Sequence, residues 1–378
     1  MKLYAFFCPK FDNMDVEMAF SSVVQNFVIN NAQAFLAARN IDFDFLNKVA
    51  HRQCDPSGLL LTSSAVHGIA TMASDIDMLC VVDEVVSTEQ MATQVHQEGL
   101  HLELLMFNST DVHLALQELA SLAQKPTLVC LQEYSSWDVR NKIPRKYVER
   151  LVYGVTHGLT TPYLSALDDL SVVVSRKDLD VFRMNIACSR LAQRSDEIFA
   201  AVGYLMNALI AAMNSLLSMS GWVLSNKKWT LRRWNKSRDL VFLGLCPTTW
   251  IEVSALWADV AKGPRMLDEA LSRTETLLQQ ITSRQAPELL DDEALIGFQG
   301  DVRRYPLHGQ AALVCAGDGY VRLAENAPTG LTLAQRFTDL DQLPRLSALE
   351  HLQAIRAGTW SPSLQRPSVF TNEGAQHV

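Results

Sequence analysis

Short apolar segments alternate with segments of helical spacing in the first part of the chain. Strands are expected at 58–63, 75–82, 100–107 and 127–132, and helices at 14–38, 43–53, 88–97 and 111–124. Strands interleaved with helices are typical of a domain in which helices cover a sheet. Residues 1–144 are therefore expected to form an α/β domain.

The strand pattern fades from about residue 145. Apolar residues then recur at helical spacing in 147–155, 179–191, 196–217 and 251–281. This spacing predicts a mostly helical domain over 145–286, built as a bundle.

The last segment, 287–378, has a mixed pattern. It contains a hairpin pattern at 311–315 and 319–323, a helical pattern at 346–357, and a loose tail over the last twenty residues. The predicted fold class is therefore α+β. A mixed-sheet domain with helices comes first, a helical bundle domain second, and a short C-terminal extension of undefined role third.

The composition is that of a folded chain. Of the 378 residues, 48% are hydrophobic and 20% are charged, which allows a buried core and argues against disorder. The formal net charge of −8 argues against a nucleic-acid groove spread over the whole surface. A small neutral or cationic acceptor fits better than a nucleic-acid partner.

Cysteine spacing and the apolar segments bear on the compartment. The seven cysteines and nine histidines show no zinc or redox spacing, so reduced thiols and no structural zinc are expected. The N-terminal apolar run is too short for the core of a signal peptide. Segment 198–226 is uncharged and long enough to span a bilayer, but its Asn and Ser residues favour a buried helix. A cytoplasmic protein with no membrane partner is expected.

Two aspartates in the expected strand at 75–82 are the main chemical signal. Asp75 and Asp77 are two residues apart, so alternation places both carboxylates on one face, roughly 7 Å apart. Such a pair can hold one or two Mg²⁺ ions. These ions neutralise a polyphosphate and polarise the phosphorus under attack.

The segment before the aspartates has the features of a phosphate-binding turn. Ser63 and Ser64 end the preceding strand, where their hydroxyls and N–H groups can hold the β- and γ-phosphates. Gly68 allows a helix or a ligand to approach closely. His67 is a candidate phosphate contact.

The residues from 63 to 77, SSAVHGIATMASDID, resemble the signature of the nucleotidyltransferase superfamily (polymerase beta-like fold), which includes the aminoglycoside nucleotidyltransferases. That signature is Gly-Ser, about ten residues, then Asp-hydrophobic-Asp. The matching positions are Ser64, Gly68, Ser74, Asp75 and Asp77. Ser63 stands where the family usually has glycine, and serine restricts the turn if a positive φ is needed. A looser similarity in the order of elements extends over roughly 40–140.

The resemblance implies a set of catalytic and metal-binding residues. Asp75 and Asp77 would be joined by Glu103, which lies on the expected neighbouring strand. Alternation places His101 on the same face as Glu103. By resemblance, Glu103 either completes the metal site or acts as general base for the acceptor hydroxyl.

The same resemblance implies the cofactors. Mg²⁺ would bind Asp75, Asp77 and Glu103, and ATP or another nucleoside triphosphate would bind Ser63, Ser64, His67, Gly68 and Lys228. Lys228 belongs to SNKKWTLRRW, which resembles the Lys-Trp segment of small-molecule members, with Lys227 or Arg232 as substitutes. The basic run is equally consistent with a solvated helix end. Trp222, Trp229 and Trp234 are expected to pack in the core.

Three functions follow from these residues. The first is the transfer of a nucleoside monophosphate, AMP from ATP in the first instance, to a small-molecule hydroxyl or similar group with release of pyrophosphate. The second is nucleotidylation of a protein or an RNA end, which the basic run at 227–238 favours and the overall acidity opposes. The third is an inactive nucleotide-binding sensor, which the retention of both aspartates opposes. The acceptor, the base preference and the oligomeric state are not encoded in any pattern.

Overall fold

The computed structural model of the protein describes residues 15–84, 92–97, 99–240, 245–289, 295–298, 302–306, 312–316, 319–323, 334–336, 340, 343–357 and 360–361. The chain divides into two compact units. Unit 1 comprises 1–125, 133–175 and 216–247, and unit 2 comprises 126–132, 176–215 and 248–378. Each unit combines segments that are distant in sequence, unlike the consecutive domains that the sequence pattern predicts.

The elements of unit 1 are α1 (Asp15–Ala37), α2 (Phe43–Ala50), β1 (Gly58–Leu61), β2 (Ile76–Val82), β3 (Ala92–Gln97), β4 (Leu100–Asn108), α3 (Ser109–Ala123), α5 (Trp137–Arg140), α6 (Arg145–Val152), η3 (Leu164–Ala166), η4 (Lys227–Trp229) and α9 (Thr230–Ser237). Three helices contribute residues to both units: α4 (Thr127–Ser135), α7 (Leu167–Arg194) and α8 (Ile198–Met219).

The remaining elements, which belong almost entirely to unit 2, are α10 (Pro247–Ala261), η6 (Pro264–Met266), α11 (Leu267–Gln285), η7 (Pro287–Leu289), β5 (Leu295–Phe298), β6 (Val302–Pro306), β7 (Ala312–Ala316), β8 (Gly319–Leu323), β9 (Ala334–Arg336), α12 (Arg345–Arg356) and β10 (Trp360–Ser361). The fold class is mixed α+β, as the sequence predicts.

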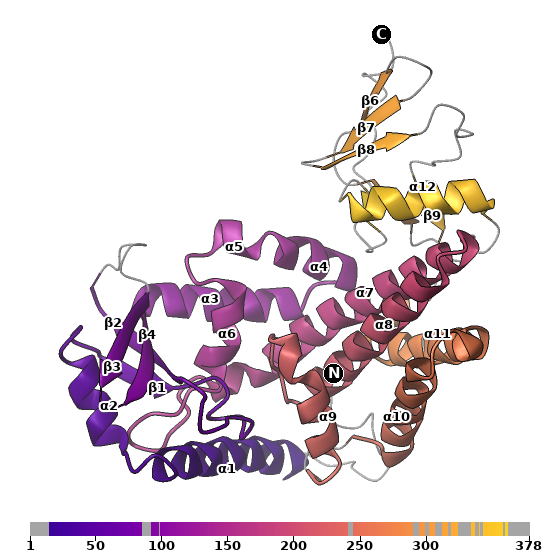
Figure 1. Cartoon of the computed structure of the whole chain (residues 1–378). Helices are drawn as coiled ribbons and strands as arrows, with labels where there is room; N and C mark the ends of the chain where they lie inside the picture. Colours follow the sequence, from indigo (N-terminus) through magenta and orange to yellow (C-terminus); the bar gives the residue numbers. More distant parts are fainter. Residues whose placement is uncertain are drawn as a thin grey trace. The chain divides into compact units, whose positions relative to one another are not determined.

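Unit 1 contains a four-stranded mixed sheet in the order β1-β2-β4-β3 (Figure 1). The central strands β2 and β4 are parallel, and β1 and β3 pair antiparallel at the two edges. The β2–β4 register sets Asp77 directly opposite Glu103. Because directly paired residues point to the same face of a sheet, the strand pairing alone brings these two carboxylates together.

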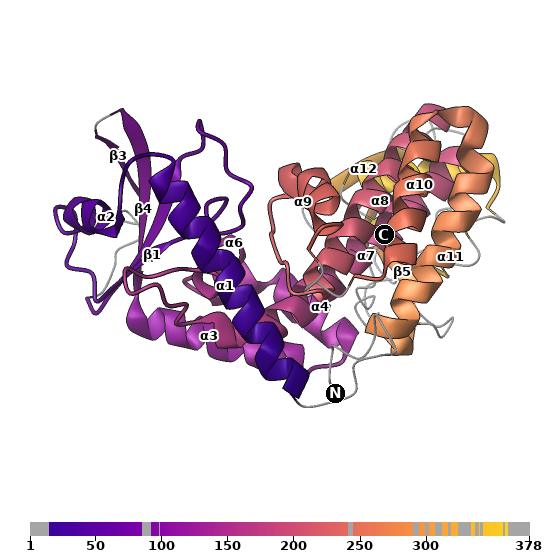
Figure 2. The ribbon, with the colours of Figure 1, turned by 90° about the horizontal axis from the view of Figure 1, so that it is seen from below.

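The position of β2 in the core of unit 1 explains why its sequence is almost entirely apolar. Met78, Leu79 and Cys80 are all fully buried, although they alternate between the two faces. A strand covered on both sides needs apolar residues at consecutive positions. Helix α3 packs against β2 and β4, and α1, which buries Val24 and Val28 one helical turn apart, runs near the sheet in Figure 2.

Two segments form a different secondary structure from the one expected: one expected helix is a strand, and one expected strand is a helix. The segment 88–97 was expected to be helical, but its described part, 92–97, is the edge strand β3, and 88–91 lie outside the described residues. The polar residues of this segment carry little periodic signal, and pairing with the free edge of β4 decides its conformation.

The segment 127–132 was expected to be a strand and instead forms most of α4. Its buried residues Thr127, Cys130, Leu131 and Tyr134 follow helical spacing. A short apolar run does not by itself distinguish a buried strand from a buried helix, and the strand prediction is therefore wrong.

The expected elements of the second half are largely confirmed. The hairpin prediction corresponds to the antiparallel pair β7–β8, and the last predicted helix corresponds to α12. The pattern at 251–281 is divided between α10 and α11, because Gly263 takes a φ of 90° and Pro264 begins η6. Figures 1 and 2 show α10 and α11 side by side. The expected tail beyond 361 lies outside the described residues.

In the described part of the chain, α8 is the one helix long and apolar enough to cross a membrane. Most of the apolar window is buried inside the protein, and Ala201, Leu205 and Ala208 are completely covered. The core helix of a soluble protein passes the same test of length and composition, so this finding is weak evidence for a membrane span.

Candidate active site

The Asp77–Glu103 pair is the centre of the candidate site. Asp77 is largely buried, with a side chain 15% exposed, and it shares a hydrogen bond with Glu103. Burial raises the pKa of Asp77 to about 6, Arg150 acts in the opposite direction, and Glu103 raises the pKa further. Two carboxylates this close repel one another, so the pair favours a bound proton or a cation.

Asp75 lies just before β2 and is more exposed than Asp77. Its Oδ1 is 2.7 Å from Nδ1 of His101, and the ring of His101 stacks on His96, with 4.6 Å between the ring centroids. His101 and His96 are register partners on β4 and β3. The structure thus pairs Asp77 with Glu103 and pairs Asp75 with His101.

The turn after β1 connects directly to Asp77. Ser63 adopts a φ of 60°, in the left-handed region, and its side chain acts to lower the pKa of Asp77, while the N–H of the preceding Thr62 donates to the carbonyl oxygen of Asp77 at 3.0 Å. The carbonyl oxygen of Ser64 accepts hydrogen bonds from the N–H groups of Ile69 and Ala70, both at 3.2 Å. The positive φ at Ser63 explains why glycine is usual at this position in the family that the sequence resembles.

Two substitutions at Ser63 separate backbone strain from the effect of the hydroxyl. Both Ser63→Gly and Ser63→Ala remove the hydroxyl, but only glycine tolerates the left-handed conformation without cost. We expect the Gly variant to be more stable than the Ala variant by about 1 kcal/mol in urea unfolding. Equal midpoints for the two variants would contradict the strained turn.

Gly68 closes the same turn for a steric reason. It has a φ of 63°, and a Cβ atom at this position would lie 2.4 Å from Oδ1 of Asn31 on α1. Asn31 in turn donates to the carbonyl oxygen of Val66. The glycine therefore lets α1 approach the turn, a different partner from the phosphate-binding helix or the ligand expected from the sequence.

We expect Gly68→Ala to destabilise the protein by about 3 kcal/mol, because strain at positive φ adds to a clash with Asn31. Gly99→Ala is the matched control, since Gly99 has a φ of 75° but no heavy atom within 4 Å of the added Cβ. The control is expected to cost about 1 kcal/mol. Similar losses in the two variants, measured by thermal unfolding, would argue against the clash.

His67 is buried in the core instead of facing outward. Its Nδ1 accepts a hydrogen bond from Nε1 of Trp222 at 3.1 Å, and its ring lies against Tyr153. Burial, together with Arg233, lowers the pKa of His67 to about 3, so the ring is neutral. This position favours a structural role for His67 over the phosphate contact expected from the sequence.

The basic segment 225–238 is attached to the motif turn. Lys236 donates to the carbonyl oxygen of Gly68 at 2.8 Å. Trp222, which precedes the segment, donates a hydrogen bond to His67. Buried Arg233 donates to the carbonyl oxygens of Trp222 and Leu224, at 2.6 and 3.3 Å. These contacts hold the start of the segment in place.

Lys228 lies on the exposed side of this segment. Its Nζ is 5.1 Å from the centre of the Trp229 ring, and the Arg232 guanidinium is 5.6 Å from the same ring. The structure therefore presents the two candidate phosphate contacts Lys228 and Arg232 together. Trp222 and Trp234 are buried, as expected for packing residues, whereas Trp229 is only partly buried and lies under the two cations.

Arg150 is a site residue that the sequence analysis missed. It lies on α6, and its Nη1 is 3.2 Å from Oδ1 of Asp77. No local pattern marks this arginine, because its partner lies 73 positions earlier in the chain.

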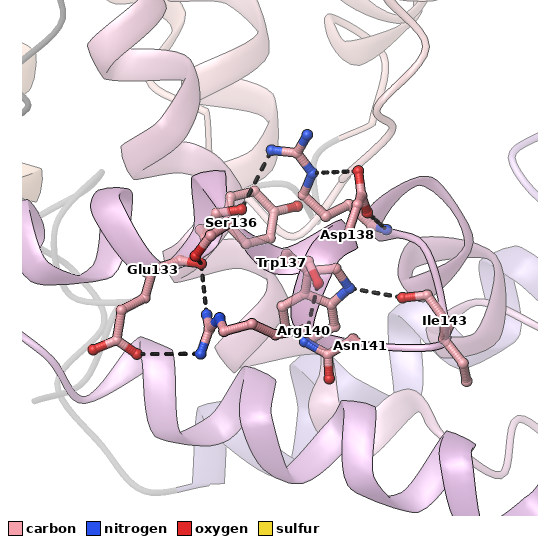
Figure 3. Close-up of polar contacts among 9 residues, drawn as sticks. Glu133, Ser136, Trp137, Asp138, Arg140, Asn141 and Ile143 are labelled. Carbon is pink, nitrogen blue, oxygen red and sulfur yellow. Dashed lines mark hydrogen bonds and ion pairs between the residues drawn. The ribbon is translucent and has the colours of Figure 1, made fainter. Parts of the chain in front are cut away.

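The N-terminus of α6 is held by contacts from α5, the short helix that precedes it. The backbone N–H and the Nε of Arg145 donate to Asp138, which supplies the cap that Pro144 cannot provide. Figure 3 shows Asp138 and Trp137, both on α5, and the Nε1 of Trp137 donates to the carbonyl oxygen of Ile143 at 2.7 Å. Helix α5 thereby sets the position of α6 and of Arg150.

The carboxylates partly fit a divalent cation. Aspartate and glutamate oxygens are the ligands that Mg²⁺ prefers, and Asp77 and Glu103 are already adjacent. However, among the residues that the structure describes, no group of three or more His, Cys, Asp or Glu side chains is arranged to hold a metal ion. The third expected ligand, Asp75, is bound to His101 instead.

Comparisons with known proteins identify the family. A family of unknown function (DUF6001) matches residues 22–361, so the chain belongs to that family. Comparison with curated proteins gives no match.

Among solved structures, the chain is similar to the crystal structure of a nucleotidyltransferase-like protein from Exiguobacterium sibiricum 255-15. The two are 13% identical, the match covers 66% of this chain and 76% of that chain, and the TM-score is 0.30. A similarity this low says nothing about the chemistry of the site, and any functional assignment rests on the geometry of the site itself.

Proposed function

We propose that this protein is a magnesium-dependent nucleotidyltransferase. In the proposed reaction, a hydroxyl oxygen of a small acceptor attacks the α-phosphorus of a nucleoside triphosphate, ATP in the first instance. The bond from the α-phosphorus to the bridging oxygen breaks, pyrophosphate leaves, and the hydroxyl proton passes to a base. The observation that carries the proposal is the Asp77–Glu103 pair, with the turn at Ser63 attached to the Asp77 backbone through Thr62.

The proposed metal ligands are Asp75, Asp77 and Glu103. When bound, Mg²⁺ supplies charge neutralisation for the triphosphate. Asp77 and Glu103 already share one face of the sheet, and Asp75, just before β2, contacts His101 on the strand that carries Glu103. The carboxylate oxygens of these side chains are suitable ligands for a hard cation. Asp75 would contact both His101 and the cation.

The proposed triphosphate contacts come from the turn and the basic segment. Ser63 and Ser64 bring hydroxyl and backbone groups next to Asp77, and Lys228 with Arg232 adds positive charge. The Lys236–Gly68 hydrogen bond supports this assignment, because it ties the basic segment to the turn. Positive charge beside a phosphate turn stabilises the polyphosphate and the charge that develops as pyrophosphate leaves.

A small acceptor is proposed because the chain as a whole is acidic. A macromolecular acceptor would need a wider positive surface than segment 225–238.

The test is pyrophosphate release with Mg²⁺, each of four nucleoside triphosphates and pooled hydroxyl compounds, repeated with Asp75→Asn and Asp77→Asn. We expect acceptor-dependent release with one preferred triphosphate and its loss in both variants. Tight Mg²⁺-dependent binding without release would indicate a sensor. Absence of nucleotide binding would refute the proposal.

A further inference from the structure

Helix α6 is fixed at both ends. At its start, Asp138 holds Arg145 as described above. At its end, the hydroxyl of Tyr153 donates to the carbonyl oxygen of Gly221 at 2.6 Å and accepts from the N–H of Val223 at 2.9 Å. A helix held in this way presents its side chains in a fixed position.

Glu149 adds a third attachment next to Arg150. This carboxylate is 5% exposed and accepts a hydrogen bond from the backbone N–H of Ser225. Ser225 is the residue at which the basic segment begins. Consecutive residues of α6 thus contact the carboxylate pair and the start of the basic segment.

The contact of Arg150 with Asp77 is mostly shielded from water. The side chains of Arg150 and Asp77 are 22% and 15% exposed. The guanidinium also lies 5.3 Å from the ring of Tyr147, one turn earlier on the same helix. Electrostatic attraction is stronger at such a position than at the surface, so the arginine restrains the carboxylate firmly.

We propose that Arg150 is a positioning residue that holds Asp77 beside Glu103 in the geometry the reaction requires. The guanidinium offsets the repulsion between two adjacent carboxylates and fixes the side-chain angle of Asp77. The role of Arg150 in turnover rests on the proposed function. The pairing of Arg150 with Asp77, which restrains the folded protein, does not depend on the proposed function.

The test compares Arg150→Met and Arg150→Lys with Lys146→Met, a matched loss of positive charge at an exposed position of the same helix. We expect Arg150→Met to raise the half-saturating Mg²⁺ concentration for pyrophosphate release at least tenfold and to weaken Mn²⁺ binding, measured by electron paramagnetic resonance, by a similar factor. Arg150→Lys is expected to recover part of both losses. Lys146→Met is expected to change neither.

Urea unfolding supplies a readout that does not depend on activity. We expect the midpoint of Arg150→Met to fall and the double variant Arg150→Met/Asp77→Asn to regain more than half of the loss, because the unpaired charge is then gone. A double variant as unstable as the single one would overturn the pairing.

The two readouts separate the possible failures. Wild-type protein that releases no pyrophosphate would remove the proposed function, and with it the role in turnover, while the urea data decide the pairing. Active wild-type protein with an unchanged Mg²⁺ requirement in Arg150→Met would overturn the positioning role alone. An equal effect of Lys146→Met would do the same.

Discussion

Asp77→Asn is expected to reduce acceptor-dependent pyrophosphate release about a thousandfold, which corresponds to about 4 kcal/mol of lost transition-state stabilisation. The amide keeps the shape of the side chain but removes the negative charge that would bind Mg²⁺. It also removes the charge that pairs with Arg150. The measurement is the steady-state rate at saturating nucleotide and Mg²⁺, with folding checked by circular dichroism.

Asp83→Asn is the control for this prediction. Asp83 follows the other end of β2 and accepts a hydrogen bond from Ser109 at 2.9 Å, away from the carboxylate pair. Its replacement is expected to change the rate less than about twofold. An Asp77→Asn variant as active as Asp83→Asn would contradict the assignment of Asp77.

Glu103→Gln addresses the question that the resemblance leaves open. A metal ligand and a general base differ in what rescues the variant. If Glu103 is a ligand, more Mg²⁺ should restore part of the rate. If Glu103 is the base, a higher pH should restore the rate and Mg²⁺ should not.

Glu149→Gln is expected to make the protein more stable at pH 8 by about 3 kcal/mol and to change little at pH 5. Burial raises the pKa of Glu149 from 4.5 to about 7, and the hydrogen bond from Ser225 and the charges of Arg233 and Arg150 offset only part of this effect. The amide oxygen of glutamine can still accept the hydrogen bond from Ser225.

The direction in which folding stability changes with pH follows from the number of protons that Glu149 binds in the folded and unfolded states. Between pH 4.5 and about 7 the folded state binds more protons at Glu149 than the unfolded state, so its stability falls as the pH rises. Above pH 7 the cost of a buried charge is fully present, and the variant avoids it. Urea unfolding of both proteins across this range measures the effect, and parallel curves would contradict the raised pKa.

The arrangement of the two facing carboxylates was largely predictable from the sequence. The two-residue spacing of Asp75 and Asp77 and the alternation around Glu103 are local properties of strands, and the β2–β4 register then places Asp77 and Glu103 together. The restricted turn at Ser63 was also predictable, since the family that the sequence resembles usually has glycine there. The sequence left open whether this position needs a positive φ, and the structure gives Ser63 a φ of 60°.

Other features depended on contacts between distant residues. His67 lies in the middle of the motif, yet its environment is set by Trp222 and Tyr153, which come from two later segments. The edge strand β3 has a weak pattern of its own and forms where β4 leaves backbone groups to be paired. Tertiary contacts override weak local propensity in both cases.

The sequence by itself determined the carboxylates, the strained turn, the class of fold and most of the helices, because each depends on residues close together in the chain. The tertiary structure decided which charges meet. Arg150 reaches Asp77 across 73 positions, His101 reaches Asp75 across 26, and Glu149 reaches Ser225 across 76. Local periodicity shows which face of an element a side chain occupies, whereas an ion pair depends on how the elements pack.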